Sequence, residues 1–214
     1  MLKFIEKLKT DAWRTAGARY NAARRLERRD LFATISLSLF SAVGVGLAVV
    51  QRIYAFEPSS PADNYITALS VCLGIFLLVI SLIEWGASNS VKADRLHQNA
   101  EELNAFQREL GLVILDINAG KQVTSDDAGK YLKKYDEIKA RSSFNHAPLD
   151  DHLFVATHRH ADEFKKLNGK NPYGWIEEQW LTFRSVFSSI WHFLGFWLVI
   201  AVLIWLTPWS QAAK

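Results

Sequence analysis

Three long apolar runs, separated by polar segments, dominate the hydropathy pattern of the chain. Residues 31–50 and 65–83 contain no charged side chain, and residues 186–207 contain one titratable group, His192. Because a helix rises about 1.5 Å per residue, roughly 20 apolar residues cross the hydrocarbon core of a bilayer. A buried helix of a soluble protein is the alternative for one such run, but three of them predict three membrane-spanning helices.

The polar segments have helical spacing and lack the alternation that is typical of strands. The predicted fold class is therefore all-α, an integral membrane protein with three transmembrane helices and a helical domain between spans two and three. The remaining segments are 1–30, a basic amphipathic juxtamembrane helix; 51–64, an external loop; 84–184, a cytoplasmic helical domain; and 208–214, an external tail.

Helix start and stop signals divide the middle segment further. The second span is predicted to continue as one helix up to Gly120, which closes it, and Thr124 offers a capping oxygen to the next helix. Pro148 suits the first turn of a third helix, which is predicted to reach about Leu167. Trp175 then begins an aromatic-rich helix that leads into the third span.

Basic residues determine the predicted orientation. Residues 1–30 carry nine Lys or Arg against four acidic residues, whereas residues 51–64 carry a single basic residue, Arg52. Basic segments beside a span stay on the cytoplasmic side. The amino terminus is therefore predicted inside and the carboxyl terminus outside. The basic first segment is predicted to contact anionic membrane lipids, and no direct nucleic-acid binding is expected.

A heptad stripe follows the second span. Leu96, Leu103, Leu110 and Ile117 recur every seven residues, which is the spacing of a coiled-coil seam. Two interpretations stay open at this point. The stripe packs against other helices of the same chain, or it associates with a second copy and controls gating.

Small residues recur every four positions in the first span, at Thr34, Ser38, Ala42 and Gly46. Such a stripe lets helices approach closely in lipid, where packing drives association. The alternative is a pore lining, because hydroxyl groups and small side chains also tolerate water.

Two ionisable residues lie beside or within the apolar runs, where a charge is costly. Glu84 directly follows the second run, and His192 lies in the third. Glu84 at the level of the lipid headgroups is one interpretation. The functional alternatives are a ring of carboxylates at the inner mouth of an oligomeric pore, which favours cations, or an ion pair between Glu84 and His192 that stabilises a closed state.

The sequence offers little that is typical of catalysis. Gly-x-Ser-x-Gly, His-Glu-x-x-His, Cys-x-x-Cys and phosphate-binding glycine motifs are missing, and Cys72 is the single cysteine. Five of the six histidines lie in the middle segment, but their spacing does not place them on one helical face. The chain is therefore predicted to be no enzyme and to need no cofactor or metal. Those histidines are His97, His146, His152, His158 and His160.

Short motifs before the first span and in the middle segment resemble those of a known family. They are Trp13-Arg14-Thr15, Arg19-Tyr20-Asn21-Ala22, Arg25-Leu26, Tyr135-x-x-Ile138 and the corner formed by Asn145, His146 and Asp150. Over about residues 10–170 the chain resembles the SLATT proteins, the SMODS- and SLOG-associating two-transmembrane effector domains of bacteria. Its third C-terminal span is a departure from the two-span pattern.

The resemblance implies a function. SLATT proteins are regarded as pore-forming effectors of the bacterial inner membrane that act in antiviral defence. A homo-oligomer would open on a signal from a partner sensor or a nucleotide, disrupt the membrane and stop growth by abortive infection. The alternative is a non-conducting membrane scaffold or sensor that recruits a cytoplasmic partner through its helical domain.

Overall fold

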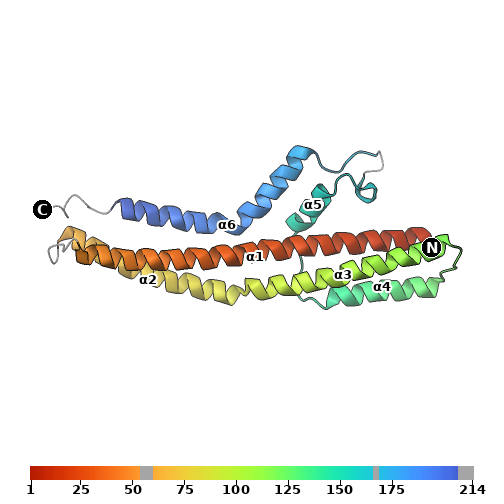
Figure 1. Cartoon of the computed structure of the whole chain (residues 1–214), viewed down its shortest axis with the longest axis horizontal. Helices are drawn as coiled ribbons and strands as arrows, with labels where there is room; N and C mark the ends of the chain where they lie inside the picture. Colours follow the sequence, from red (N-terminus) through yellow and green to blue (C-terminus); the bar gives the residue numbers. More distant parts are fainter. Residues whose placement is uncertain (54–59, 166–168, 207–214) are drawn as a thin grey trace. The chain divides into compact units, whose positions relative to one another are not determined.

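The computed structural model describes residues 1–53, 60–165 and 169–206, and every regular element in these ranges is helical (Figure 1). This confirms the all-α prediction. The helices are α1 (Leu2–Ile53), α2 (Pro61–Ala87), α3 (Asn89–Asn118), α4 (Ser125–Ala140), α5 (Pro148–Thr157), the short 3₁₀ helix η1 (Asp162–Phe164) and α6 (Trp175–Trp205).

Three helical stretches of the described chain are long and apolar enough to cross a membrane. They lie in α1, in the stretch that begins with α2, and in α6, so the prediction of three spans is confirmed at the level of length and composition. Most of the predicted external loop, 51–64, and the predicted tail, 208–214, lie outside the described residues. The external location of both stays a prediction.

The chain divides into two compact units. One comprises Met1–Glu27 and Ser90–Ser188 and is called the helical domain below. The other comprises Arg28–Asn89 and Ser189–Lys214 and is called the spanning unit. The first 27 residues therefore belong to the helical domain, whereas the sequence suggested a separate juxtamembrane helix for them.

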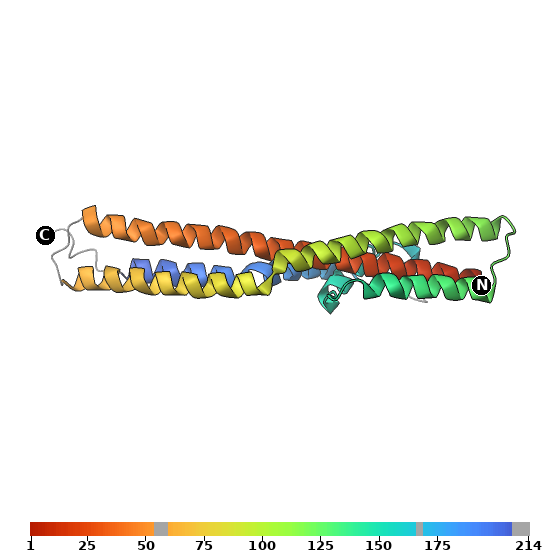
Figure 2. The ribbon, with the colours of Figure 1, turned by 90° about the horizontal axis from the view of Figure 1, so that it is seen from below.

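The core of the helical domain forms where α3 and α4 run alongside the first part of α1, as a second view also shows (Figure 2). Ile5, Leu8, Ala12 and Ala16 recur on one face of α1, and this spacing turns one apolar stripe toward the two other helices. The buried residues that complete the core are Leu103, Phe106, Leu110, Ala128, Tyr135 and Ile138.

The heptad stripe lies inside this domain. Leu96, Leu103 and Leu110 are each no more than 1% exposed, and Ile117 packs against the same core. Within one chain Leu103 and Leu110 already have partners on α1 and α4, and Leu96 packs against α1. Intrachain packing, the first of the two interpretations, therefore accounts for their burial.

The predicted end of α3 and the predicted start of α4 are found, and the helix predicted from span two to Gly120 is interrupted at one residue, Ser88. Gly120 has φ +96°, and the N–H of Lys121 bonds the carbonyl of Asp116 at 3.0 Å, which is the Schellman ending that glycine permits. Thr124 caps α4 as predicted, in a reciprocal capping box with Asp127. Ser88, with φ +50°, interrupts the helix between α2 and α3.

The third helix of the middle segment is also shorter than predicted. α5 begins at Pro148 but ends at Thr157, well before Leu167, which itself lies outside the described residues. The Thr157 hydroxyl donates to the carbonyl of Phe154 at 2.9 Å, and Nδ1 of His158 lies 2.9 Å from the same oxygen. These side chains occupy a carbonyl at the helix end, so the backbone can turn without leaving it unsatisfied.

The spanning unit is a bundle of α1, α2 and α6. Its core residues are Phe40, Leu47, Ala62, Ile66, Leu73 and Ile200. Polar bonds also join the three helices: Trp197 Nε1 donates to Ser36 Oγ at 3.2 Å, and the Tyr65 hydroxyl donates to the Leu203 carbonyl at 2.8 Å. In hydrocarbon such bonds keep polar groups satisfied while apolar side chains fill the bundle.

Candidate functional site

A polar cluster joins the three helices of the spanning unit around Glu84 near the end of α2. Arg29 Nη2 of α1 donates to Glu84 Oε1 at 2.8 Å, and Asn89 Nδ2 donates to Oε2 at 3.2 Å. His192 of α6 approaches with Nε2 4.0 Å from Oε1, which is longer than a hydrogen bond. We call these four residues the Glu84 cluster.

The charge balance of the Glu84 cluster depends on Arg29. The Glu84 side chain is only 11% exposed, and burying a carboxylate without a counter-charge is costly. The guanidinium supplies that counter-charge. The sequence brought Glu84 and His192 together as a hypothesis but missed Arg29 as the direct partner.

A signal for Arg29 was present in the sequence. It is among the last basic residues before the first span, and Glu84 is the first acidic residue after the second span. An antiparallel hairpin of two spans brings these two positions to the same end of the bundle. The expectation of a short external connection was therefore enough to suggest the pair.

The small-residue stripe of α1 does not face the other two helices of the spanning unit. Thr34, Ser38, Ala42 and Gly46 are all exposed. The Thr34 hydroxyl donates to the Asp30 carbonyl at 3.0 Å, and that of Ser38 donates to the Thr34 carbonyl at 2.8 Å. Because both hydroxyls are satisfied within their own helix, the stripe can face lipid or a second copy without an unpaired donor.

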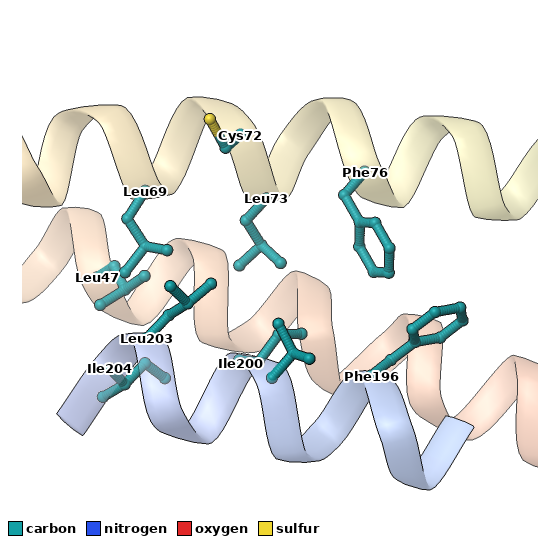
Figure 3. A pocket seen from close by; sticks show the side chains of 10 residues that line it. Leu47, Leu69, Cys72, Leu73, Phe76, Phe196, Ile200, Leu203 and Ile204 are labelled. Atoms are coloured by element: carbon teal, nitrogen blue, oxygen red, sulfur yellow. The ribbon is translucent and has the colours of Figure 1, made fainter. Parts of the chain in front are cut away.

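An apolar cleft of about 350 Å³ lies between the helices of the spanning unit (Figure 3). Figure 3 shows Phe76 of α2 and Phe196 of α6 at one end and Leu69 of α2 and Ile204 of α6 toward the other. Cys72 lies at the edge of the cleft and is exposed. The side chains that line the cleft carry no charged group, so it provides a hydrophobic packing surface.

In the helical domain, the motif residues of α1 meet the corner before α5. Arg25 binds Asp150 through both oxygens, at 2.9 and 3.0 Å, and Asp150 is fully buried. The same carboxylate accepts the backbone N–H of Ala147 at 2.9 Å, and Asn21 donates to the Asp150 carbonyl at 3.0 Å. The corner therefore attaches to α1 through one buried carboxylate.

Other motif residues make a second row of contacts. Arg14 binds both oxygens of Asp151, at 2.7 and 2.6 Å, and the side chains of Thr15 and Tyr135 share a hydrogen bond of 2.9 Å. The desolvation of Asp151 opposes ionisation, yet Arg14 holds the pKa of that carboxyl below its usual range. The short motifs that seemed scattered in the sequence thus hold α1 to α4 and α5.

Trp13 and Gly17 of α1 contact aromatic rings of α5 and η1. The Trp13 ring stacks on Phe164 at 5.0 Å and meets Phe154 edge-on at 5.5 Å. The Phe154 ring lies so close to Gly17 that a Cβ at this position would overlap it. Gly17 is therefore required by the close approach of the ring to α1.

Arg19 and His146 are the exceptions in this network, because their polar atoms are incompletely paired. Arg19 is 4% exposed, and burial lowers the pKa of its guanidinium. Burial likewise lowers the pKa of His146, against the opposing charge of Asp151, and its Nδ1 has no hydrogen-bond partner. Asn145 completes the corner by accepting the His146 N–H at 3.0 Å.

The described residues contain no group of three His, Cys, Asp or Glu side chains that could hold a metal ion. His97 lies near Glu101 and Tyr20, and His158 lies at the end of α5. The prediction that the chain needs no metal or cofactor stays untested by this arrangement.

Comparison with protein-family models gives a match over nearly the whole chain. The model of the SMODS and SLOG-associating 2TM effector domain family 5 matches residues 1–207. The match is longer than the resemblance in the sequence, about 10–170, and it includes all of α6. Searches of curated proteins and of solved structures found no match.

Proposed function

Because the chain belongs to the SMODS and SLOG-associating 2TM effector domain family 5, we propose that this membrane effector kills or arrests its cell by forming an oligomeric pore. The pore would lie in the inner membrane of a bacterium and open on a signal from a partner sensor. Its effect on the cell would be physical, by loss of the membrane potential, and would require no catalysis.

The observation that carries this proposal is the Glu84 cluster. The Glu84 carboxylate of α2 binds Arg29 of α1 and lies 4.0 Å from His192 of α6, and these are the three described helices able to cross a membrane. Removing one partner of a buried ion pair leaves an uncompensated charge, which is strongly destabilising. The cluster can therefore act as a latch that keeps the spans together until a signal separates them.

A route for the signal follows from helix continuity. α1 runs without interruption from Leu2 to Ile53, so one helix belongs to the helical domain at one end and to the spanning unit at the other. α6 also belongs to both units, to the helical domain up to Ser188 and to the spanning unit after it. A change in packing of the helical domain would act directly on two spans, as a switch between two states requires.

The exposed stripe of α1 supports the oligomer. In lipid, helices associate through small residues that permit close backbone approach. Thr34, Ser38, Ala42 and Gly46 offer such a surface outside the packed face of the helix. A second copy could pack there without displacing α2 or α6.

The latch is tested with purified full-length protein in liposomes that hold a potassium gradient. We expect Glu84→Gln to increase basal ion leak several-fold over the wild type, because Arg29 would lose its counter-charge. Glu101→Gln, which neutralises an exposed carboxylate of the helical domain, is the matched control and should leave leak unchanged.

Three outcomes separate the alternatives. A shift in potassium-over-chloride preference without added leak would favour the carboxylate ring over the latch. Equal leak and equal potassium-over-chloride preference in the Glu84→Gln variant and the wild type would remove both roles of Glu84. If no variant leaks and expression leaves the membrane potential intact, the non-conducting scaffold is the better account.

A further inference from the structure

A polar pocket of about 540 Å³ lies in the helical domain, beside the motif network. Its walls come from α1, from the end of α4 and from the segment that leads to α5. The lining residues that matter below are Arg19, Asp136, Lys139, Ser143, Asn145 and His146.

Arg19 differs from the two other motif arginines of α1. Arg14 and Arg25 each bind a carboxylate through two hydrogen bonds, whereas the recorded partners of Arg19 are neutral. Its Nη1 donates to the side-chain oxygen of Asn99, and Nη2 donates to the Lys139 carbonyl at 3.3 Å.

The charge of Arg19 is thus buried without a counter-charge. No ion pair of Arg19 occurs among the described residues, and its Nε has no hydrogen-bond partner. Buried charges in proteins are normally paired, because desolvation is otherwise uncompensated. A guanidinium that lines a pocket and has no carboxylate partner can pair with an anion from outside the chain.

The other polar groups of the pocket add positive charge and donors. Lys139 Nζ lies 3.8 Å from the nearest carboxylate oxygen, on Asp136, whose side chain is 63% exposed. The Asn145 side-chain oxygen already accepts the N–H of His146, which leaves the amide N–H groups as donors. His146 Nδ1 is buried and unpaired. Asp136 is the single acidic group in the lining.

We propose that this pocket binds a phosphate-bearing anion, with Arg19, Lys139 and His146 around the phosphate. Guanidinium and ammonium groups are the usual partners of phosphate oxygens in proteins. The volume leaves room for the group that carries the phosphate. The proposal goes beyond pore formation, because it assigns a ligand class to the helical domain, and binding would persist in a protein that conducts nothing.

Two sources could provide this chemistry, a soluble phosphate compound or the headgroup of a phospholipid. Pyrophosphate serves as the soluble probe. Phosphatidic acid, whose headgroup is a bare phosphate, serves as the lipid probe. Full-length protein in nanodiscs of phosphatidylcholine alone, or with phosphatidic acid added, presents the two sources separately.

Calorimetric titration of pyrophosphate into the phosphatidylcholine nanodiscs measures the affinity. We expect saturable binding in the wild type and a loss of about tenfold or more in Arg19→Gln, the size of one charge-assisted hydrogen bond. Arg19→Lys should lose part of the affinity, because lysine keeps the charge but lacks the planar guanidinium that binds two oxygens at once. Circular dichroism shows whether each variant keeps its helices.

A second pair of variants tests the pocket if Arg19→Gln fails to fold. Lys139→Gln changes a residue of the pocket, and Lys133→Gln is its matched control. Both lysines belong to α4, and each lies 3.8 Å from a carboxylate on its own helix, but Lys133 does not line the pocket. We expect weaker binding only in Lys139→Gln. Equal affinity in these two variants would overturn the proposal.

The lipid arm identifies the source. If added phosphatidic acid abolishes pyrophosphate binding in the wild type and equally in Lys133→Gln, the occupant is a lipid headgroup; persistence of pyrophosphate binding indicates a soluble compound. An absence of saturable pyrophosphate binding in phosphatidylcholine, together with equal retention of phosphatidic acid by Lys139→Gln and Lys133→Gln, would also refute the site.

Discussion

At the scale of residues, the helical domain depends on a few charged side chains whose burial differs. Asp150 and Asp151 are neighbours in sequence, and each binds an arginine of α1 through two oxygens. Asp150 is fully buried, whereas the Asp151 side chain is 19% exposed and its partner Arg14 is 48% exposed. The same pairing therefore has two very different energetic consequences.

We expect Asp150→Asn to lower the free energy of unfolding by about 3–5 kcal/mol, because Arg25 would lose the buried carboxylate that it binds through two hydrogen bonds. The matched variant Asp151→Asn should cost about 1 kcal/mol or less, because water screens the more exposed pair. Thermal unfolding of the full chain in mild detergent measures both. Equal losses would show that burial of Asp150 does not control its contribution.

The sequence marked these residues without explaining them. Arg25, Asn145, His146 and Asp150 stood out as parts of short motifs, but no pattern said that Arg25 reaches Asp150 across about 125 residues. Contacts at such separation depend on how α1 and α5 pack. For the same reason, the motif that contains Arg19 did not indicate that this side chain is buried.

At the scale of elements, helix ends and faces follow local rules, while breaks and contacts between helices follow packing. Gly120 and Thr124 end and begin helices as their chemistry predicts. Ser88 breaks the predicted long helix in a left-handed conformation that serine rarely adopts, so no residue pattern indicated this break. The contact between α1 and α5 also depends on packing, because the Phe154 ring approaches α1 at a residue without a side chain, Gly17.

Two glycines test that contact. We expect Gly17→Ala to lower the free energy of unfolding by about 1–3 kcal/mol, because the new Cβ would overlap Phe154. Gly111→Ala, in the open part of α3, should raise it by up to about 1 kcal/mol through helix propensity. Opposite signs of the two shifts in thermal unfolding are the expected result. A stabilising Gly17→Ala would mean that α5 does not pack on α1 in this way.

At the scale of the whole molecule, membership of the effector family covers both units and all three apolar helices. The family name refers to two spans, yet the match reaches residue 207 and so includes α6. The third apolar helix, α6, is therefore included in the sequence pattern of the family. An odd number of spans would place the two termini on opposite sides of the membrane.

Cysteine labelling tests this topology in a Cys72→Ser background. We expect an impermeant maleimide to label Lys214→Cys on intact cells and Lys3→Cys only after permeabilisation, because the basic amino-terminal segment should stay in the cytoplasm. The experiment is done at low expression, before membrane potential is lost. Labelling of both positions on intact cells would contradict three spans.

The sequence by itself determined the fold class, the three apolar helices and the family, because hydropathy and short motifs are local properties that need no partner to be recognised. The tertiary structure alone decided which polar groups are paired. It joined Glu84 to Arg29, filled the heptad stripe from within the chain and left Arg19 buried without a carboxylate. Pairing is set by which helix faces meet, and that depends on the packing of the whole chain.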